Sequence, residues 1–248
     1  MSFDVKRIAA MIDHTCLKAD ATSRDIDRLC REALRFGFCC VCVNGAWVAH
    51  CAAELRGSAV KVASTAGFPL GAGLTRAKAF EAEAAAAAGA AEIDMVMSVG
   101  RFLEEKYGDV RRDIAEVVEA VRGGAIVKVI LETGYLNEEQ IRAACEIAAS
   151  AGAHFVKTST GFGPGGASAR HVALMRAAVP PSVGVKAAGG IRTFADAVRM
   201  AEAGASRIGT SAGAAIMADA AGGRPGAADA PRAADGAAGT DGTAEGAY

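Results

Sequence analysis

Two lysines lie in apolar segments typical of strands, where a charged side chain is unusual. Lys157 ends the run HFVK at 154–157, and Lys186 lies in a similar run, GVKAAGG, at 184–190. Burial and nearby positive charge both lower the pKa of a lysine from about 10.4 toward neutrality, which frees the amine to act as a nucleophile. The structural alternative is a lysine that reaches out of the strand end or pairs with a carboxylate. Adjacent parallel strands lie roughly 4.8 Å apart, so the two lysines could influence each other strongly.

The two lysines are expected to be positioned by strands and helices that alternate along the chain. The predicted strands are 11–15, 39–44, 60–64, 92–97, 126–132, 154–157, the run around Lys186, and 206–209. A short leading helix is expected at 4–10, and the later helices at 22–37, 46–55, 74–88, 109–121, 137–152, 167–178 and 193–203. Thr22 or Ser23 and Asn137 are expected N-caps, Gly37 is an expected end, and Thr210 with Ser211 should open the last helix.

Eight such units in a chain of 248 residues favour an α/β fold of the closed (β/α)8, or TIM barrel, type. An open doubly wound sheet is the alternative, but it usually has a glycine-rich turn after its first strand, and this chain has CLKAD there. We expect one barrel domain at 1–218. Residues 219–248 are rich in alanine and glycine and should form a mobile, disordered C-terminal tail.

The composition argues against several classes of function. A net charge of −1 creates no overall field for nucleic acid or an anionic membrane. No apolar stretch approaches the roughly 18 residues that a membrane-spanning helix needs. The seven cysteines are an odd number and follow no secretory signal, which indicates reduced thiols and a cytoplasmic protein. Cys39 and Cys42 form a C-x-x-C pair without a second ligand pair, so we expect no zinc site.

In barrels of this type the functional residues lie at the carboxyl ends of the strands. The polar, sulfur-containing or small residues at these predicted ends are Asp13, His14, Thr15, Cys42, Asn44, Ser64, Asp94, Lys128, Glu132, Lys157, Thr158, Ser159, Thr160, Lys186, Gly209, Thr210 and Ser211. The set contains several lysines and carboxylates with hydroxyl residues between them, and of the four histidines only His14 belongs to it. Metal-dependent aldolases and hydrolases need several convergent histidines, so we set that class aside.

Glycines precede the last two predicted helices. Gly189-Gly190 and Gly209-Thr210-Ser211 each place free backbone N–H groups at a helix start, where anions bind. Phosphate sites after strands seven and eight recur in such barrels. Either glycine segment alone is better explained by a tight turn, but the two together favour a phosphate site.

Eight motifs occur in order between residues 12 and 211: IDHT, VCVN, GFPLG, EIDMV, KVILET, VKTSTGFG, VKAAGGIRT and RIGTS. With them the chain resembles deoxyribose-phosphate aldolase, a class I (Schiff-base) aldolase. The resemblance implies that Lys157 forms the Schiff base, that Lys186 lowers its pKa, and that Asp94 shuttles protons through water. It further implies substrate or phosphate binding by Gly161, Gly189, Gly190, Gly209, Ser211, Thr15 and Cys42, the last two near the small aldehyde.

The implied reaction is the reversible cleavage of 2-deoxy-D-ribose 5-phosphate to D-glyceraldehyde 3-phosphate and acetaldehyde, a step of deoxyribonucleotide catabolism. It needs no metal or organic cofactor. The expected partners are a phosphorylated sugar and, by family habit, a second copy in a homodimer, with no nucleic acid and no membrane. Two alternatives stay open: a Schiff-base aldolase for another phosphorylated aldehyde, and a non-catalytic barrel whose lysines only bind an anionic sugar.

Three further expectations concern single residues. Asp13 is interpreted as a hydrogen-bonding support of the site, and Lys128 with Glu132 as a structural ion pair. Tyr248, the last residue, is either part of an inert tail or a proton relay that visits the open barrel mouth.

Overall fold

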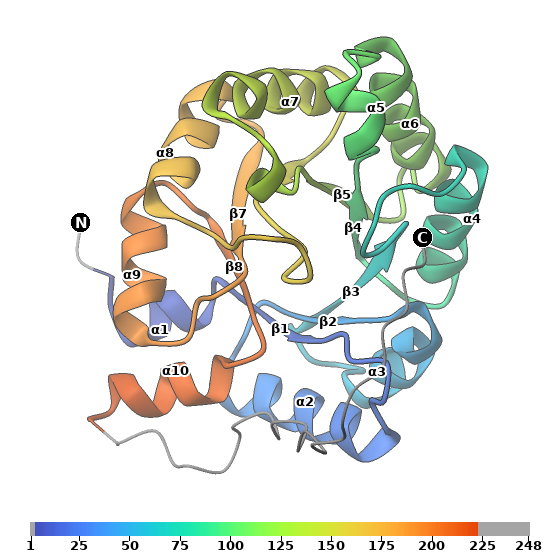
Figure 1. Ribbon diagram of the computed structural model, residues 1–248. Helices are drawn as coiled ribbons and strands as arrows, with labels where there is room; N and C mark the ends of the chain where they lie inside the picture. The colour runs from blue at the N-terminus through green and yellow to red at the C-terminus, as the bar shows by residue number, and fades with distance from the viewer. Residues whose placement is uncertain (1–2, 223–248) are drawn as a thin grey trace, which may run out of the picture.

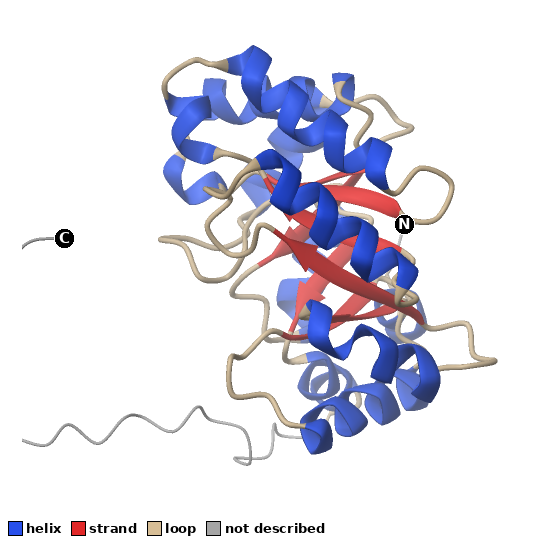
Figure 2. Ribbon diagram, turned by 90° about the vertical axis from the view of Figure 1, so that its right-hand side faces the viewer, coloured by secondary structure: helices blue, strands red, loops and turns tan. Residues whose placement is uncertain are grey.

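The computed structural model describes residues 3–222, and eight parallel strands close into one barrel in the order of the chain. Helices form a ring around the barrel (Figure 1). In the side view the strands are enclosed by helices (Figure 2). The predicted (β/α)8 fold is therefore confirmed. Residues 223–248, including Tyr248 and most of the predicted tail, lie outside the described residues.

The strands run from the floor of the barrel to its mouth, and each pairs in parallel with its neighbours, β1 closing on β8. They are β1 (Ile12–Cys16), β2 (Cys40–Val43), β3 (Lys61–Ala66), β4 (Glu92–Val96), β5 (Ile126–Ile130), β6 (Phe155–Lys157), β7 (Gly184–Ala188) and β8 (Arg207–Thr210). Every predicted strand is present, with ends that differ by at most two residues.

The helices lie outside the strands and connect them. They are α1 (Val5–Ala9), α2 (Ser23–Phe36), α3 (Val48–Glu54), α4 (Thr75–Ala87), α5 (Val99–Leu103), α6 (Tyr107–Ala120), α7 (Glu138–Ser150), α8 (Ala169–Ala178), α9 (Phe194–Glu202) and α10 (Gly213–Ala220), with short 3-10 turns η1 (Gly45–Trp47) and η2 (Thr133–Tyr135). The short helix α5 was not predicted. Among residues 3–222, none of these helices is long and apolar enough to cross a membrane.

The expected helix ends are largely confirmed. Thr22 forms a capping box with Asp25 at the start of α2, and Gly37 ends that helix in the left-handed conformation at φ 66°. Asn137 accepts a hydrogen bond from the Gln140 N–H at the start of α7. The prediction that Thr210 opens the last helix was wrong. Thr210 is the last residue of β8, and α10 begins three residues later, at Gly213.

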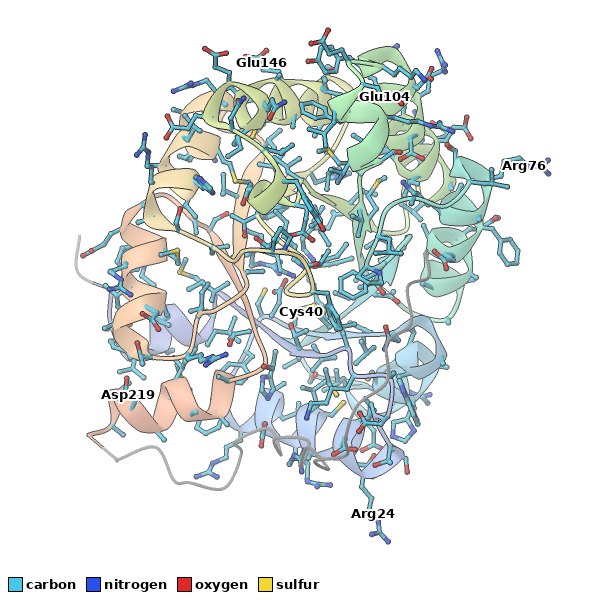
Figure 3. All side chains as sticks on the ribbon, viewed as in Figure 1. Arg24, Cys40, Arg76, Glu104, Glu146 and Asp219 are labelled. Carbon is cyan, nitrogen blue, oxygen red and sulfur yellow. The ribbon has the colours of Figure 1, made fainter. Side chains whose placement is uncertain are left out.

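Alternate residues of each strand face either the helices or the barrel interior. In β5, Val127 and Val129 pack in the apolar core under the helices, whereas the intervening Lys128 joins the buried ion pairs inside the barrel. In Figure 3 the side chain of Cys40 on β2 lies inside the barrel, whereas Arg24 on α2 and Glu146 on α7 extend outward from the helices. The helices thus supply stability, and the inward face of the strands is left to carry chemistry.

Candidate active site

A pocket of about 300 Å³ opens at the carboxyl ends of β1, β6, β7 and β8. It is where sequence reasoning placed the site. The residues expected to bind substrate or phosphate that line it are Thr15, Gly161, Gly189, Gly190, Gly209 and Ser211, together with Lys157. Gly189 and Gly190 have φ of 96° and 80°, which only glycine adopts readily. Because glycine has no side chain, their backbone itself lines the pocket.

Lys157 and Lys186 are direct neighbours across β6 and β7, because their Cα atoms are register partners. Both ammonium nitrogens lie 2.7 Å from the same carboxylate oxygen, Asp94 Oδ2. Asp94 comes from β4, on the other side of the interior, and its second oxygen lies 2.7 Å from Lys128 Nζ. Asp94 and Lys186 are completely buried, whereas Lys157 is 3% exposed and forms part of the pocket wall.

The two neighbouring lysines differ in their expected charge. Burial lowers the pKa of Lys157; Asp94 opposes this shift, and the positive charge of Lys186 adds to it. Burial also acts to lower the pKa of Lys186, but Asp13 and Asp94 outweigh it and raise that pKa above the ordinary lysine value. Lys157 therefore loses its proton at lower pH than Lys186. The direction agrees with the role that the resemblance implies for Lys186, although burial is the larger cause.

Asp94 remains an ionised carboxylate beside these lysines. Burial acts to raise its pKa, but Lys128, Lys157 and Lys186 together hold it well below the ordinary aspartate value. Asp13 is more than a hydrogen-bonding support: its Oδ2 lies 2.6 Å from Lys186 Nζ, and its Oδ1 lies 2.6 Å from Arg207 Nη1. Burial acts to raise the Asp13 pKa, and the surrounding cations lower it to about 2.

The predicted ion pair between Lys128 and Glu132 was wrong. Lys128 points into the barrel and pairs with Glu92 and Asp94, at 2.7 Å each. Glu132 lies beyond the end of β5, where the chain turns into the left-handed conformation at φ 55°. Its carboxylate there accepts hydrogen bonds from the N–H and hydroxyl of Thr160. Glu132 thus holds the loop after β6 instead of balancing a lysine.

Two other candidates lie away from the pocket wall. Cys42 is completely buried beneath it, in a small apolar cluster with Cys40 and Ala63, and burial raises the pKa of its thiol. His14 points outward, and its Nε2 lies 2.6 Å from Glu32 on α2. Neither side chain lines the pocket.

Sequence reasoning missed several residues that do line the pocket. Lys18 and Arg192 bring two positive charges, and Phe162 contributes an aromatic ring that is 62% exposed. Phe162 also contacts Phe68 edge-on, at 5.4 Å between ring centroids. A signal existed for Arg192, which comes two residues after the Gly189-Gly190 pair, and for Lys18, which follows β1. Both lie in loops just after strand ends rather than in the strands themselves.

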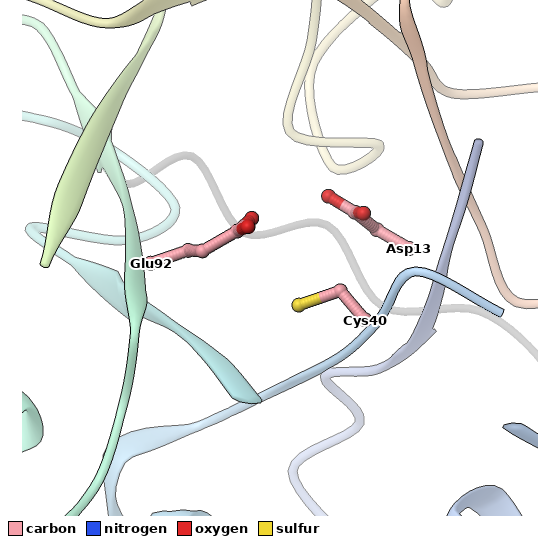
Figure 4. A group of neighbouring side chains, drawn as sticks. All are labelled: Asp13, Cys40 and Glu92. Atoms are coloured by element: carbon pink, nitrogen blue, oxygen red, sulfur yellow. The ribbon is translucent and has the colours of Figure 1, made fainter. Parts of the chain in front are cut away.

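Two groups of side chains among the described residues have the composition of a metal site, and the buried one consists of Asp13, Cys40 and Glu92. The ligand atoms of Asp13, Cys40 and Glu92 lie within 4.8 Å of one another, and Figure 4 shows the two carboxylates directed toward each other across the interior. Both carboxylates already have cationic partners, since Arg207 contacts Asp13 and Glu92 and Lys128 contacts Glu92. Burial raises the pKa of the Cys40 thiol well above its usual value. These residues do not fit a resident metal ion.

The fold and the site together define a (β/α)8 barrel with a lysine nucleophile candidate beside a second lysine and a carboxylate. Residues 7–219 match the DeoC/LacD family of aldolases. The deoxyribose-phosphate aldolase of Lysinibacillus sphaericus is 52% identical over 212 residues, which cover 86% of this chain and 95% of that protein. The deoxyribose-phosphate aldolase of Coprothermobacter proteolyticus is 56% identical over 207 residues, 84% of this chain and 94% of that protein.

Solved structures give the same result. A deoxyribose phosphate aldolase from Aeropyrum pernix, described as tetrameric, has a TM-score of 0.79 and 35% identity, and the match covers 86% of this chain and 90% of that one. The chain belongs to the DeoC/LacD aldolase family, and it is an aldolase, a carbon–carbon lyase.

Proposed function

We propose that this chain catalyses the reversible cleavage of 2-deoxy-D-ribose 5-phosphate to D-glyceraldehyde 3-phosphate and acetaldehyde, with Lys157 as the Schiff-base lysine. The observation that carries the proposal is the position of Lys157. It is the buried lysine whose Nζ contacts Asp94 and which also reaches the pocket wall. The names of the relatives support the choice of substrate over another phosphorylated aldehyde.

In the direction of synthesis, the neutral amine of Lys157 attacks the carbonyl carbon of acetaldehyde. Loss of water from the adduct gives an iminium ion, whose positive charge acidifies the methyl protons. Removal of one of these protons gives an enamine, and its carbon attacks the aldehyde carbon of glyceraldehyde 3-phosphate. Water then releases the product and restores the amine. The low pKa of Lys157 provides the neutral amine for the first step.

Asp94 is the acid/base of the proposal. Its carboxylate lies 2.7 Å from Lys157 Nζ, so a water molecule held beside both groups reaches the carbon next to the imine. Because three lysines keep the Asp94 pKa low, it does not retain the proton but passes it on through water. Lys186 stays charged and contributes through its field on Lys157.

The phosphate is assigned to the pocket side formed by β7 and β8. Gly189, Gly190, Gly209 and Ser211 lie at the ends of these two strands, Gly161 after β6 lines the same pocket, and Lys18 and Arg192 add positive charge to the pocket wall. Backbone N–H groups before helices together with cations make a suitable environment for a dianion. Thr15 lies on the same pocket wall, whereas Cys42 forms the buried layer beneath, so direct contact with the small aldehyde is assigned to Thr15 alone.

Borohydride trapping tests the proposal, because only an imine is reduced to a stable adduct. With acetaldehyde, we expect about one reduced ethyl group on the peptide that contains Lys157, and a fall in turnover on the order of 10⁴-fold or more for Lys157→Ala. Activity should survive EDTA. A barrel that only binds phosphorylated sugars would give no adduct, and an adduct on Lys186 would reverse the roles of the two lysines.

A homodimer and a cytoplasmic location belong to the proposal as expectations from the family resemblance. Because the relative from Aeropyrum pernix is described as tetrameric, sedimentation analysis should test whether this chain forms a dimer or a tetramer.

A further inference from the structure

Within residues 3–222, seven charged side chains are linked into one buried ion-pair network, and six of them form a closed ring of alternating charge. The successive links of the ring, with their shortest distances, are Asp94–Lys128 2.7 Å, Lys128–Glu92 2.7 Å, Glu92–Arg207 2.7 Å, Arg207–Asp13 2.6 Å, Asp13–Lys186 2.6 Å and Lys186–Asp94 2.7 Å. Six strands contribute to the network: β1, β4, β5, β6, β7 and β8. Each ring member is thus paired on both sides.

The seventh side chain is Lys157, which is attached to the ring through Asp94 alone. Three carboxylates and three cations make the ring neutral without it. A protonated Lys157 therefore gives the buried network a net charge of +1, and a neutral Lys157 gives it zero. Since an unbalanced buried charge is costly, the balance of the ring favours the neutral amine.

Two ring members lie at the amino ends of their strands, away from the pocket wall. Glu92 is the first residue of β4 and Arg207 the first residue of β8, at the floor of the barrel, and neither lines the pocket at the mouth. Arg207 Nη1 and Nη2 bind both oxygens of Glu92, at 3.0 and 2.7 Å, and Nη1 also reaches Asp13. Figure 4 shows the carboxylates of Asp13 and Glu92 directed toward each other from opposite sides.

We propose that Glu92 and Arg207 are positioning residues for the reaction: by completing the neutral ring, they leave no uncompensated carboxylate for the ammonium form of Lys157 and so hold this lysine as the reactive amine. The inference rests on the proposed function, because it concerns how the Schiff-base lysine becomes nucleophilic. It assigns a role to the floor of the barrel, which touches no substrate.

The other polar groups in the interior do not change the net charge of the ion-pair network. Cys40 and Cys42 on β2 are thiols whose pKa is raised by burial, so they stay neutral. β3 contributes the apolar Ala63 to the same layer. Lys18 and Arg192 lie at the pocket rim, where solvent screens their charges.

The test measures the pH at which Lys157 becomes reactive, by competitive acylation with acetic anhydride and mass spectrometry of the Lys157 peptide. This readout does not require turnover. Arg207→Met removes a positive charge, so Lys157 should hold its proton more tightly and its midpoint should rise by about one pH unit. Glu92→Gln removes a negative charge, so the midpoint should fall by about one unit. The double variant Glu92→Gln/Arg207→Met restores neutrality, and its midpoint should return to the wild-type value.

Two controls separate this role from a structural one. Arg207→Lys keeps the charge and should leave the midpoint in place. Lys78→Met breaks another buried ion pair, with Asp113 at 2.7 Å between α4 and α6, and should cost stability without moving the midpoint. Glu92→Gln is nearly isosteric and carries the test if Arg207→Met does not fold.

Midpoints that stay unchanged in folded Glu92→Gln, or that move in the same direction in both single variants, would overturn the proposal. The failure of the proposed function is a separate outcome. If the two single variants shift the Lys157 midpoint in opposite directions but the wild-type protein forms no trapped imine with acetaldehyde, the charge-balancing role of the ring stands and the aldolase assignment for Lys157 is lost.

Discussion

The interior of the barrel and the layer between strands and helices are both closed to solvent, yet the interior contains charged side chains and the outer layer contains mainly apolar ones. The outer layer is apolar, with fully buried residues such as Ile93, Ile114 and Val156. The interior holds Asp94 and Lys186, which are also fully buried, in a network of ion pairs. Apolar packing is non-directional and tolerates small changes, whereas a buried charge requires each of its partners. Stability and chemistry are thus assigned to different faces of the same strands.

Among the described residues, the outer layer also contains an ion pair whose two side chains are both buried, Lys78 with Asp113. Lys78 on α4 lies 2.7 Å from Asp113 on α6 and donates to the Val96 carbonyl oxygen at 3.0 Å. Burial lowers the pKa of Lys78, as it does for Lys157. Only Lys157 lines the pocket, however, and Lys78 is 1% exposed beneath the helices. A lowered pKa alone therefore does not identify a nucleophile; contact with a pocket is also needed.

The largest effect in this comparison is expected for Lys186→Leu. Asp13 and Asp94 lose a shared cation, which should cost about 3–5 kcal/mol of stability, as when one partner of a buried pair is removed. The pKa of Lys157 should rise because a neighbouring positive charge is gone. Its neutral form then exists only at higher pH, so the pH profile of kcat/KM should shift upward by about one unit or more.

Lys186→Arg tests geometry at the same position. It keeps the charge, but the planar guanidinium does not reproduce two contacts made from a single nitrogen. Activity should fall while the pH midpoint stays near the wild-type value. An active Leu variant with an unmoved pH profile would contradict the electrostatic role of Lys186.

The fold could be predicted because each strand–helix unit repeats the same local pattern. Lys157 and Lys186 drew attention as charged residues in apolar strand segments, and the family motifs pointed to Asp94; the structure brings all three together, with each lysine Nζ 2.7 Å from Asp94 Oδ2. Glu92 and Arg207 could not, since they begin their strands and meet only through the closure of the barrel, across 115 residues of sequence. The pairing of Lys128 with Glu132 failed because the chain leaves the strand conformation at Glu132. The role of Tyr248 stays a prediction outside the described residues.

In the apolar outer layer, a smaller effect is expected for Ile114→Ala. Ile114 is fully buried in the outer layer on α6. Its truncation leaves a cavity and should lower the free energy of unfolding by about 2–5 kcal/mol, measured by denaturant titration. Because no charge changes, the pH profile of kcat/KM should remain that of the wild type. A shifted profile would show that the two layers are coupled and would weaken the division drawn above.

The smallest effect concerns the pocket rim, which belongs to neither layer. Ser211 is solvent-exposed and lines the pocket between the end of β8 and the start of α10. Ser211→Asp places a negative charge where the substrate's phosphate is assigned, and repulsion should raise the KM for glyceraldehyde 3-phosphate by about tenfold, or roughly 1.4 kcal/mol. Imine formation with acetaldehyde, which carries no phosphate, should be nearly unchanged.

Ser211→Asn is the matched control, because it has the shape of Asp without the charge. If the rim recognises the phosphate and the interior ring controls only the lysine, Asn should raise the KM far less than Asp, and neither variant should move the pH midpoint of Lys157. Equal losses of phosphate-dependent and acetaldehyde-dependent activity in both variants would instead mean that Ser211 supports the local fold. In that case the phosphate would have to be held mainly by Lys18 and Arg192, whose charges line the same pocket.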